Sequence, residues 1–458
     1  MNCQRGFITP ALLIIAGSFV IVIYALLLIL GLQLSFSNRQ VAQEQAINIA
    51  EAGINYYRWH LAHAPEDFQD GTGEEGPYEH EYFDPQGSKM GNFSLEITAP
   101  ENGSSIVTIK STAWTKEYPN IKRSVVSQYG KPSLTKYSFL QNASSWYGTN
   151  ITVHGLVHSN NGIRMDGINT SLVTSAQETY LCGSETGCNP SRTKPGVWGS
   201  GSGGNQGLWQ FPVPAVDFDA ISFDFRQMRD SAKNEGLYLK PSKKWGYHLI
   251  FNQNGTVQVK KVTRTRYYWG YSSDDDCQRR YERIRSETTV GTYNVSEKPI
   301  IFAEDDLWIE GSVNGKVSVV AARFPIDSYK KNIWICNNLV YADYDHSNSI
   351  GVIAQNDIYF CKDIPNDFKV DGALLAQHGK IIRHGYFWWC GGSSGALKNK
   401  LTINGSIISY YKSYWNFYDP PQSGFRERVI TYDTDLLYAP PPYFPTSGEY
   451  EFISWREE

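Results

Sequence analysis

Two patterns of apolar residues near the N-terminus predict one long helix. From Phe7 to Leu34 no side chain carries a charge, and this stretch is longer than the roughly 20 apolar residues that cross a bilayer as a helix. Beyond it, apolar residues recur every three or four positions, as on one face of a helix: Ile47, Ala50, Ile54, Tyr57 and Leu61. We expect a helix over residues 7–64, with its apolar half in a membrane and its outer half packed on a folded domain.

Residues 65–136 predict a small β region. The segment 65–90 is rich in Gly, Pro and acidic residues and indicates a loop. Three segments then alternate between apolar and polar side chains, as half-buried strands do: 92–97, 106–114 and 121–129.

A short repeat dominates residues 137–431. The pattern apolar, any residue, apolar, any residue, Gly occurs at Ile151–Gly155, Leu307–Gly311 and Leu401–Gly405. Short strands with paired apolar residues and Gly at the corners favour a parallel β-helix, in which each coil buries its apolar residues against the next. The alternative is a β-sandwich, which needs longer strands and tight hairpins. The predicted fold class is therefore mainly β with a long N-terminal helix.

The repeat is interrupted at about residues 199–262 and ends before residue 432. Within the interruption, Asp217 is a candidate N-cap, and a helical face follows at Phe218, Ile221, Phe225, Met228 and Ala232. Asn254-Gly255 predicts a hairpin. Residues 432–458 form a Pro-rich tail, which we expect to be extended, with Trp455 docking back onto the protein.

The spacing of the cysteines predicts disulfides. Cys336 and Cys361 end two similar segments 25 residues apart, about one coil, so they would lie on adjacent coils. Cys182 and Cys188 flank a short loop, which leaves Cys277 to pair with Cys390. The alternative is six free buried thiols. Cys3, the seventh cysteine, precedes the apolar stretch.

Composition and charge exclude several classes of protein. The 458 residues include 42 Lys and Arg against 46 Asp and Glu, so the net charge of −4 gives no strong overall attraction to nucleic acid. The 19% of charged and 14% of aromatic residues exclude a disordered chain and a coiled coil. Arg and Tyr alternate between Arg264 and Arg285, but acidic residues interrupt them. We interpret this stretch as a structural surface and expect no nucleic-acid partner.

No motif indicates an enzyme, a metal site or a cofactor. Asp274, Asp275 and Asp276 are adjacent, which is typical of a solvated turn. His154 and His158 are four residues apart with Gly155 between them, and no further ligand lies at a zinc-site spacing, so we expect surface histidines. We therefore predict no catalytic residue, no metal and no cofactor.

The N-terminus resembles that of type IV pilins. Arg5-Gly6 directly before Phe7 is similar to a prepilin leader, and the segment Ala46–Ile54, with Ala50-Glu51-Ala52-Gly53, resembles PilX-like minor pilins. This resemblance implies that prepilin peptidase removes residues 1–6 by cleavage between Gly6 and Phe7, and that the Phe7 amine is then methylated. It also implies that the helix, including Phe7, Ala11, Ile47, Ala50, Glu51 and Ile54, packs with other pilin subunits through the pilus assembly machinery.

The resemblance has one departure. Most major pilins carry Glu at the fifth position of the mature chain, where this chain has Ala11. In the family, that Glu pairs with the N-terminal ammonium of a neighbouring subunit, and an unpaired buried charge costs several kcal/mol. PilX-type subunits also lack it, which implies a role in filament initiation or at the tip.

The function implied is that of a non-enzymatic, membrane-anchored minor pilin with an adhesive role toward an unidentified surface ligand. Ile309–Val313, Ala373–Gln377 and the Pro-rich tail also resemble the passenger regions of large PilX-like assembly proteins. We expect a single pass through the cytoplasmic (inner) membrane, an extracytoplasmic C-terminal domain, and a place in a surface pilus after assembly. Two alternatives are a membrane-anchored β-helix enzyme acting on polysaccharide and a minor pseudopilin of a secretion system.

Overall fold

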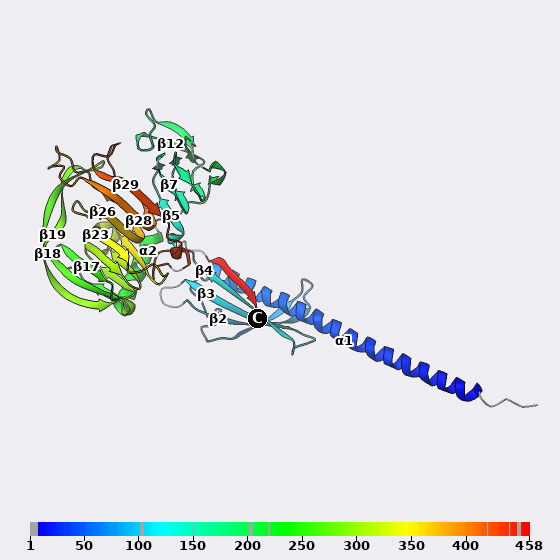
Figure 1. Ribbon diagram of the computed structural model, residues 1–458. Helices are drawn as coiled ribbons and strands as arrows, with labels where there is room; N and C mark the ends of the chain where they lie inside the picture. The colour runs from blue at the N-terminus through cyan, green and yellow to red at the C-terminus, as the bar shows by residue number, and fades with distance from the viewer. Residues whose placement is uncertain are drawn as a thin grey trace, which may run out of the picture. The chain divides into compact units, whose positions relative to one another are not determined.

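The protein is mainly β with one long N-terminal helix (Figure 1). The computed structural model describes residues 8–100, 105–149, 151–200, 205–218, 220–418, 420–438, 440–446 and 450–458. The chain divides into two compact units, which we describe separately. Unit 1 contains residues 1–101, 105–131 and 448–458, and unit 2 contains residues 102–104 and 132–447.

Unit 1 consists of helix α1 (Ile8–His63) and one antiparallel sheet. The strand order is β1-β2-β3-β4-β30, with bounds Tyr78–Phe83, Lys89–Thr98, Ile106–Thr115, Lys122–Gly130 and Glu451–Glu457. The three predicted strands are present as β2, β3 and β4. The loop prediction for residues 65–90 was wrong over β1, where charged residues between Tyr78 and Phe83 obscure the strand pattern. β30, from the tail, pairs with β4 and places Trp455 opposite Ser127.

The outer half of α1 packs on this sheet. The buried residues of α1 are Ala42, Ala46, Ile49, Ala50, Ile54, Tyr57 and Leu61, so the predicted face is correct except that Ile47 is only half-buried. At Gly53 the backbone of α1 lies close against the sheet, because a Cβ at this position would collide with Ser111 Oγ and the ring of Phe93. The small residues of the Ala50–Gly53 segment therefore let the helix lie directly on β2 and β3.

Unit 2 contains a ladder of parallel strands that joins segments far apart in sequence. The strand order is β16-β20-β22-β24-β26-β28-β5-β8-β11-β15. The bounds in this order are Leu237–Leu239, Ile300–Ala303, Lys316–Ala321, Ser349–Ala354, Asp367–Ala376, Leu397–Ser409, Tyr137–Gln141, Leu156–Ser159, Val173–Ser175 and Trp209–Gln210.

Further parallel pairings run beside this ladder. β17, β21, β23, β25 and β27 form one series, and β29 pairs with β28. Their bounds are Gly246–Asn252, Leu307–Val313, Ile333–Tyr341, Ile358–Phe360, Ile381–Arg383 and Gly424–Thr431. The glycines of the sequence repeat, Gly155, Gly311 and Gly405, all have positive φ, which Gly adopts without a steric penalty; Gly311 lies within β21 and Gly405 within β28.

The strand order differs from the sequence order at one place. β5, the first strand of unit 2, pairs with β28, so that Phe139 lies opposite Ile407. After β15 the chain returns to β16 through a segment that contains α2 (Ala220–Asn234). Phe225, Met228 and Ala232 of α2 pack in one cluster with residues of β20 and β22, so the predicted helix covers the outside of the ladder.

The remaining strands near β5 form small sheets. β6, β9 and β14 are parallel, β7 pairs in parallel with β10, and β12 and β13 form a hairpin. Their bounds are Ser145–Tyr147, Ile163–Met165, Val197–Trp198, Thr152–Val153, Ile168–Asn169, Thr179–Cys182 and Arg192–Pro195.

A long hairpin leaves the strand series and forms an arm. β17 turns at Gly255 into β18 (Thr256–Ser272), as predicted, but β18 continues past Val262 and pairs with β19 (Asp276–Asn294). Figure 1 shows this arm as a curved pair of strands at the edge of the unit. The sequence analysis missed it because Arg and Lys occupy many of its positions.

The Pro-rich tail packs on the outside of unit 2. Leu436, in α3 (Asp435–Tyr438), and Phe444 are buried in the same cluster as α2. The backbone N–H of Leu134 donates to the carbonyl of Pro445 over 2.9 Å. The predicted extended tail therefore contributes to the core before it reaches β30.

Candidate functional site

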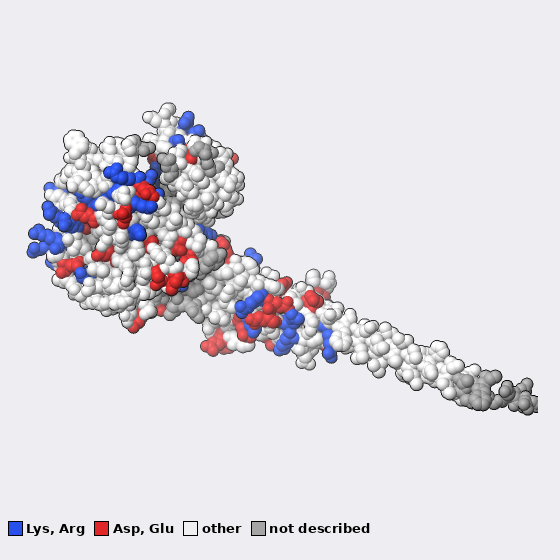
Figure 2. Space-filling model, viewed as in Figure 1, with Lys and Arg blue, Asp and Glu red and all other residues white. Residues whose placement is uncertain are grey.

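The first candidate is the apolar half of α1. The large side chains from Leu12 to Phe36 are exposed, and the most apolar window of the helix has a mean hydropathy of 3.0. Figure 2 shows no charged side chain on this part of the visible surface. An exposed apolar surface of this size indicates a membrane or protein partner, and by length and composition the helix can cross a membrane.

The predicted processing and filament residues fall into two groups. Gly6 and Phe7 lie outside the described residues, and so does the side chain of Ala11. Ala50 and Ile54 are buried on the sheet of unit 1, whereas Glu51 and Ile47 are partly exposed. Of these four residues, Glu51 and Ile47 are therefore the ones whose side chains are accessible to a partner.

The second candidate is a cleft in unit 2, between the segment 139–154, which begins in β5, and the segment 412–431, which ends in β29. Ile407, Ile408 and Ser409 of β28 pair with Phe139, Leu140 and Gln141 of β5. In the described part of the chain, no pairing joins β29 to β7 or the segment 412–416 to β6. A cavity of about 520 Å³ lies beside the paired strands β28 and β5.

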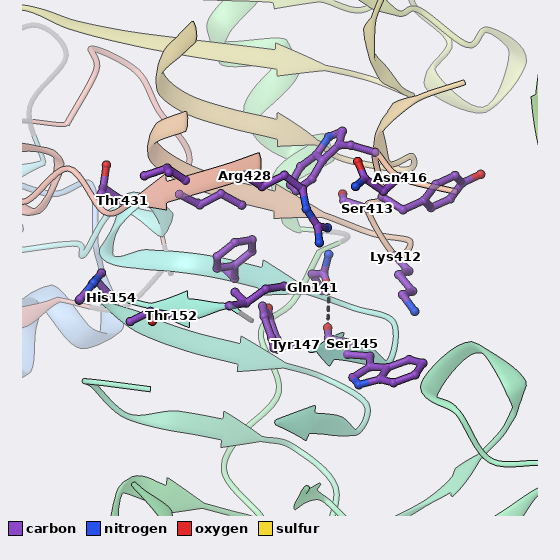
Figure 3. A pocket seen from close by; sticks show the side chains of 17 residues that line it. Gln141, Ser145, Tyr147, Thr152, His154, Lys412, Ser413, Asn416, Arg428 and Thr431 are labelled. Atoms are coloured by element: carbon purple, nitrogen blue, oxygen red, sulfur yellow. Dashed lines mark hydrogen bonds between the residues drawn. The ribbon is translucent and has the colours of Figure 1, made fainter. Parts of the chain in front are cut away.

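The cleft combines aromatic, hydroxyl and amide side chains. Figure 3 shows Arg428, Thr431, Ser413 and Asn416 facing Gln141, Ser145, Tyr147 and Thr152 across it, with Arg428 extending toward Gln141. The other described lining residues are Phe139, Trp146, Ile151, His154, Lys412, Tyr414, Trp415, Val429 and Ile430. The rings of Phe139 and Tyr147 meet edge to face at 5.3 Å and form part of the buried wall.

Two cationic side chains, Arg428 and Lys412, are among the described residues that line the cleft. Burial lowers the pKa of Lys412, and the nearby carboxylate of Glu185 opposes this effect. The Lys412 ammonium also donates a hydrogen bond to the backbone carbonyl of Glu185, which holds it at the rim.

Sequence analysis missed this cleft. Its two walls lie far apart in the chain and come together where β28 pairs with β5, as at Ser409 and Gln141, which are 268 residues apart. The available signal was the repeat itself, because Ile151–Gly155 and Leu401–Gly405 lie next to the two walls. The repeat predicts that both segments contain short strands, but not that these strands are neighbours.

The third candidate is a smaller cavity, about 270 Å³, beneath the arm. Its lining includes Glu282, Arg283, Glu310 and Asp363, together with the disulfide of Cys336 and Cys361. Trp308 and Trp334 stack in parallel nearby, with ring centroids 6.4 Å apart, and Trp308 Nε1 donates to the backbone carbonyl of Glu282 over 2.7 Å.

Glu282 is the most strongly perturbed carboxyl group of this cavity. Burial raises its pKa to about 7, although hydrogen bonds from the Lys362 N–H and the Tyr386 hydroxyl and the positive charge of Arg383 oppose the shift. Lys362 N donates to Oε1 over 2.9 Å, and Tyr386 OH donates to Oε2 over 3.1 Å. Both oxygens are thus engaged with the protein.

The structure brings together the cysteines of each predicted pair. Cys182 is bonded to Cys188, Cys277 to Cys390 and Cys336 to Cys361. Cys336 lies in β23 and Cys361 directly follows β25, which pairs with β23, so their Cα atoms are 4.8 Å apart. The bond between Cys277 and Cys390 fixes the tip of the arm, where Tyr271 and Gly385 also exchange backbone hydrogen bonds.

The other polar candidates have structural partners. His154 is exposed, but the surface prediction was wrong for His158, which is buried and bonds to Thr174 and Asn160; burial lowers its pKa. Asp274 pairs with Lys380 and Asp275 with Arg280 at the tip of the arm. Within the described residues, no group of three His, Cys, Asp or Glu side chains is placed to hold a metal ion.

The Arg- and Tyr-rich stretch forms the exposed face of the arm. Arg279 lies over the rings of Tyr267 and Trp269, and Arg283 contacts Tyr268 and Asp363. Aromatic and acidic neighbours of these arginines agree with the interpretation of a structural surface.

The fold thus defines a mainly β protein with a long apolar helix at its N-terminus. No family model matches the chain, and no curated protein matches it. Among solved structures, it is similar to the crystal structure of the competence-associated pilin ComZ from Thermus thermophilus. The sequence identity is 13%, the match covers 91% of this chain and 97% of that chain, and the TM-score is 0.31. Both the identity and the TM-score are low, so this likeness carries no functional inference.

Proposed function

We propose that this protein is a membrane-anchored minor pilin that acts in assembly or at the tip of a type IV pilus. The observation that carries the proposal is the division of α1 into two halves. Its first half exposes a continuous apolar surface, and its second half packs on an antiparallel sheet through Ala46, Ala50 and Gly53. Such a helix can be held in a bilayer and then pack into a bundle of similar helices without any change in unit 1.

In this proposal, the leader is removed and the new N-terminus is modified before the subunit assembles. Prepilin peptidase cleaves after Gly6, the Phe7 amine is methylated, and the assembly machinery moves the helix from the inner membrane into the filament. Since Ala11 offers no carboxylate to the amine of a neighbouring subunit, the subunit is suited to the start or tip of a filament. Unit 2 is then the surface-exposed passenger, a parallel β-helix with an adhesive role.

The enzyme alternative finds less support in the two cavities. A polysaccharide-cleaving site needs carboxylates that can reach a substrate. The described lining of the cleft between β29 and β5 contains none. In the cavity beneath the arm, Glu282 is engaged with Tyr386 and Lys362, Glu310 pairs with His248, and Asp363 contacts Tyr268 and Arg283. We therefore propose a binding and assembly role without catalysis.

The test is the mass of the mature N-terminus in cells that contain a prepilin peptidase. We expect a chain that begins at Phe7 and carries one added methyl group. Gly6→Val should leave the leader attached and keep the protein in the membrane. Gly17→Val is the matched control, because a Cβ at Gly17 meets no atom within 4 Å and should leave processing unchanged. A mature chain that begins at Met1, or after the apolar stretch, would overturn the proposal.

The position in the filament is tested separately with a label on unit 2. We expect labels at filament ends or on short surface structures. Labels at regular intervals along filaments would contradict the tip role while leaving the pilin assignment intact. Labels restricted to a secretion-system structure would favour the pseudopilin alternative.

A further inference from the structure

A basic depression in unit 2 lies where three connections between strands come together. Residues 240–245 join β16 to β17, residues 304–306 join β20 to β21, and residues 322–332 join β22 to β23. These connections are neighbours because β20 pairs with β16 and β22, and β21 pairs with β17 and β23. The depression has a volume of about 530 Å³, within the roughly 300–1,000 Å³ of small-molecule sites. Its lining includes Lys240, Lys243, Lys244, Asp305, Arg323 and Lys331.

One buried carboxylate holds the loop 240–245 in place. Asp305 Oδ2 accepts hydrogen bonds from the backbone N–H of Ser242 over 2.9 Å and from its hydroxyl over 2.6 Å. The same hydroxyl accepts from the N–H of Lys244 over 3.0 Å. Although burial raises the pKa of Asp305, the hydrogen bonds from Ser242 and the charge of Lys331 lower it below its usual value. The ionised carboxylate therefore fixes the loop that carries three of the lysines.

Only one of the five cations of the depression is paired. Lys331 Nζ lies 3.0 Å from Asp305 Oδ1. Within the part of the chain that the structure describes, the other four form no ion pair: Lys240, Lys243, Lys244 and Arg323. The three lysines are exposed. Arg323 lies over the ring of Tyr329, 4.2 Å from its centroid, and this contact leaves its charge available.

The two acids beside Asp305 are held by other groups. Glu304 Oε1 accepts from the hydroxyl of Tyr238 over 2.8 Å. Asp306 Oδ1 accepts from the backbone N–H of Asn332 over 2.9 Å. Neither acid is among the described residues that line the depression. The depression therefore keeps an excess of positive charge.

The depression offers many hydrogen-bond donors and few acceptors. Ammonium and guanidinium groups only donate, and both oxygens of Asp305 already accept, from Ser242 and from Lys331. A sugar hydroxyl needs an acceptor as well as a donor, whereas an ionised phosphate group only accepts and carries up to two negative charges. The described lining contains no aromatic ring on which a nucleic-acid base could stack. Phosphate is therefore the ligand group that fits.

We propose that this depression binds a chain of directly linked phosphate groups, as in inorganic polyphosphate or the triphosphate of a nucleotide. Linked phosphates bring several negative charges into one small volume, which matches four unpaired cations around about 530 Å³. Three of these cations are lysines, whose compact ammonium groups bind phosphate as point charges. The proposal goes beyond the pilin function and does not depend on it, because it uses no residue of the leader or of α1.

Titration calorimetry on the full-length protein in micelles of an uncharged detergent tests the proposal, with tripolyphosphate as the probe at low salt and without magnesium. We expect tripolyphosphate to bind, and inorganic phosphate to bind at least about tenfold more weakly because it reaches fewer of the cations. ATP carries the same three linked phosphates on a nucleoside and should bind no more tightly than tripolyphosphate. Binding should weaken as salt is added.

Three variants remove single cations from the lining. Lys244→Gln and Arg323→Gln should each weaken binding of tripolyphosphate by about fivefold or more. Lys243→Asn should do the same, and Asn suits this position because Lys243 has a φ of 56°. All three side chains are partly or fully exposed, so the variants should fold as the parent protein does.

Two control variants separate the depression from general attraction. Lys330→Gln removes an exposed cation directly before Lys331, outside the lining. Arg264→Gln removes an exposed cation of the arm. We expect both to bind tripolyphosphate within about twofold of the parent protein, because surface charges outside the site contribute little.

Several results would overturn the proposal. They are no heat of binding with tripolyphosphate at millimolar concentration, equal affinity for inorganic phosphate, an equal loss in Lys330→Gln, and unchanged binding in Lys244→Gln and Arg323→Gln. ATP binding about tenfold more tightly than tripolyphosphate would show that the nucleoside is recognised, and that the phosphate chain alone is not the ligand. Tighter binding of an oligothymidylate that displaces tripolyphosphate would assign the depression to nucleic acid instead. Processing of the N-terminus is measured independently, so either proposal can fail while the other stands.

Discussion

The hydroxyl of Tyr386 donates a hydrogen bond of 3.1 Å to the carboxylate of Glu282, 104 residues earlier in the chain. This contact joins β19 of the arm to the segment that follows β27. Burial raises the Glu282 pKa from 4.5 to about 7, so the folded protein holds a proton on this carboxyl group that the unfolded chain has already released. The arm should therefore respond to pH near neutrality.

Glu282→Gln is expected to reduce the loss of stability with rising pH. Because the folded pKa is raised, the contribution of Glu282 is fully present below about pH 4.5 and is lost as pH rises toward and through 7. A shift of this size corresponds to about 3 kcal/mol, and Gln keeps an oxygen that can accept from Lys362 and Tyr386. Urea unfolding between pH 4 and 8, followed by fluorescence and by hydrogen exchange in the arm, measures the difference.

Glu287→Gln is the matched control on the same strand. Although burial alone would raise the Glu287 pKa, hydrogen bonds from Lys260 and His248 lower it. Its contribution is therefore present above pH 4.5 and lost as pH falls, the opposite sign to Glu282. Identical pH profiles for Glu282→Gln and the parent protein would contradict the role assigned to Glu282.

The elements with regular patterns were predictable from sequence, and their order in space was not. The face of α1 from Ala50 to Leu61 and the hairpin at Gly255 follow from residue spacing alone. The pairing of Phe139 with Ile407 does not, because strands with the same short apolar pattern could pair with one another in many orders. The cleft, which depends on that pairing, was therefore hidden.

The burial of individual polar side chains also could not be predicted from the sequence. His158 and Glu282 are ordinary polar residues in the chain, and each is buried only because a distant segment covers it. For Glu282 that segment carries Tyr386, and for His158 it includes β11 with Thr174. No local pattern marks such positions, since the covering segments are specified by the whole fold.

Gly53→Val should destabilise unit 1 by about 1–3 kcal/mol, because the new side chain would collide with Ser111 and Phe93. Gly31→Val adds the same side chain to the same helix, at a position where a Cβ meets no atom within 4 Å, and should have little effect on unit 1. Hydrogen exchange of the β2 and β3 amides in the micelle-bound protein measures both. Equal protection in the two variants would show that the helix does not need a close approach at Gly53.

Removal of the disulfide between Cys277 and Cys390 should free the tip of the arm. In the chain-entropy description, closing its loop of about 113 residues contributes about 5 kcal/mol, whereas the six-residue separation of Cys182 and Cys188 contributes about 2 kcal/mol. The double Ala variant of the first pair should be cut by trypsin at the arginines of the arm well before the double Ala variant of the second. Equal resistance would mean that the contacts of Glu282 and Tyr271 hold the arm without the bond.

Ala11→Glu tests the reason for placing the subunit at a filament end. In the proposed pilin, a carboxylate at this position would accept the N-terminal ammonium of a neighbouring subunit inside an apolar bundle, where an unpaired charge costs several kcal/mol. The variant should therefore enter filament shafts, and labels on unit 2 should spread from the ends along the length. Leu12→Glu, one position further on, puts the same charge on a different side of the helix and should instead reduce assembly. If Ala11→Glu and the parent protein keep the same terminal distribution, the residue at this position does not decide where the subunit is placed.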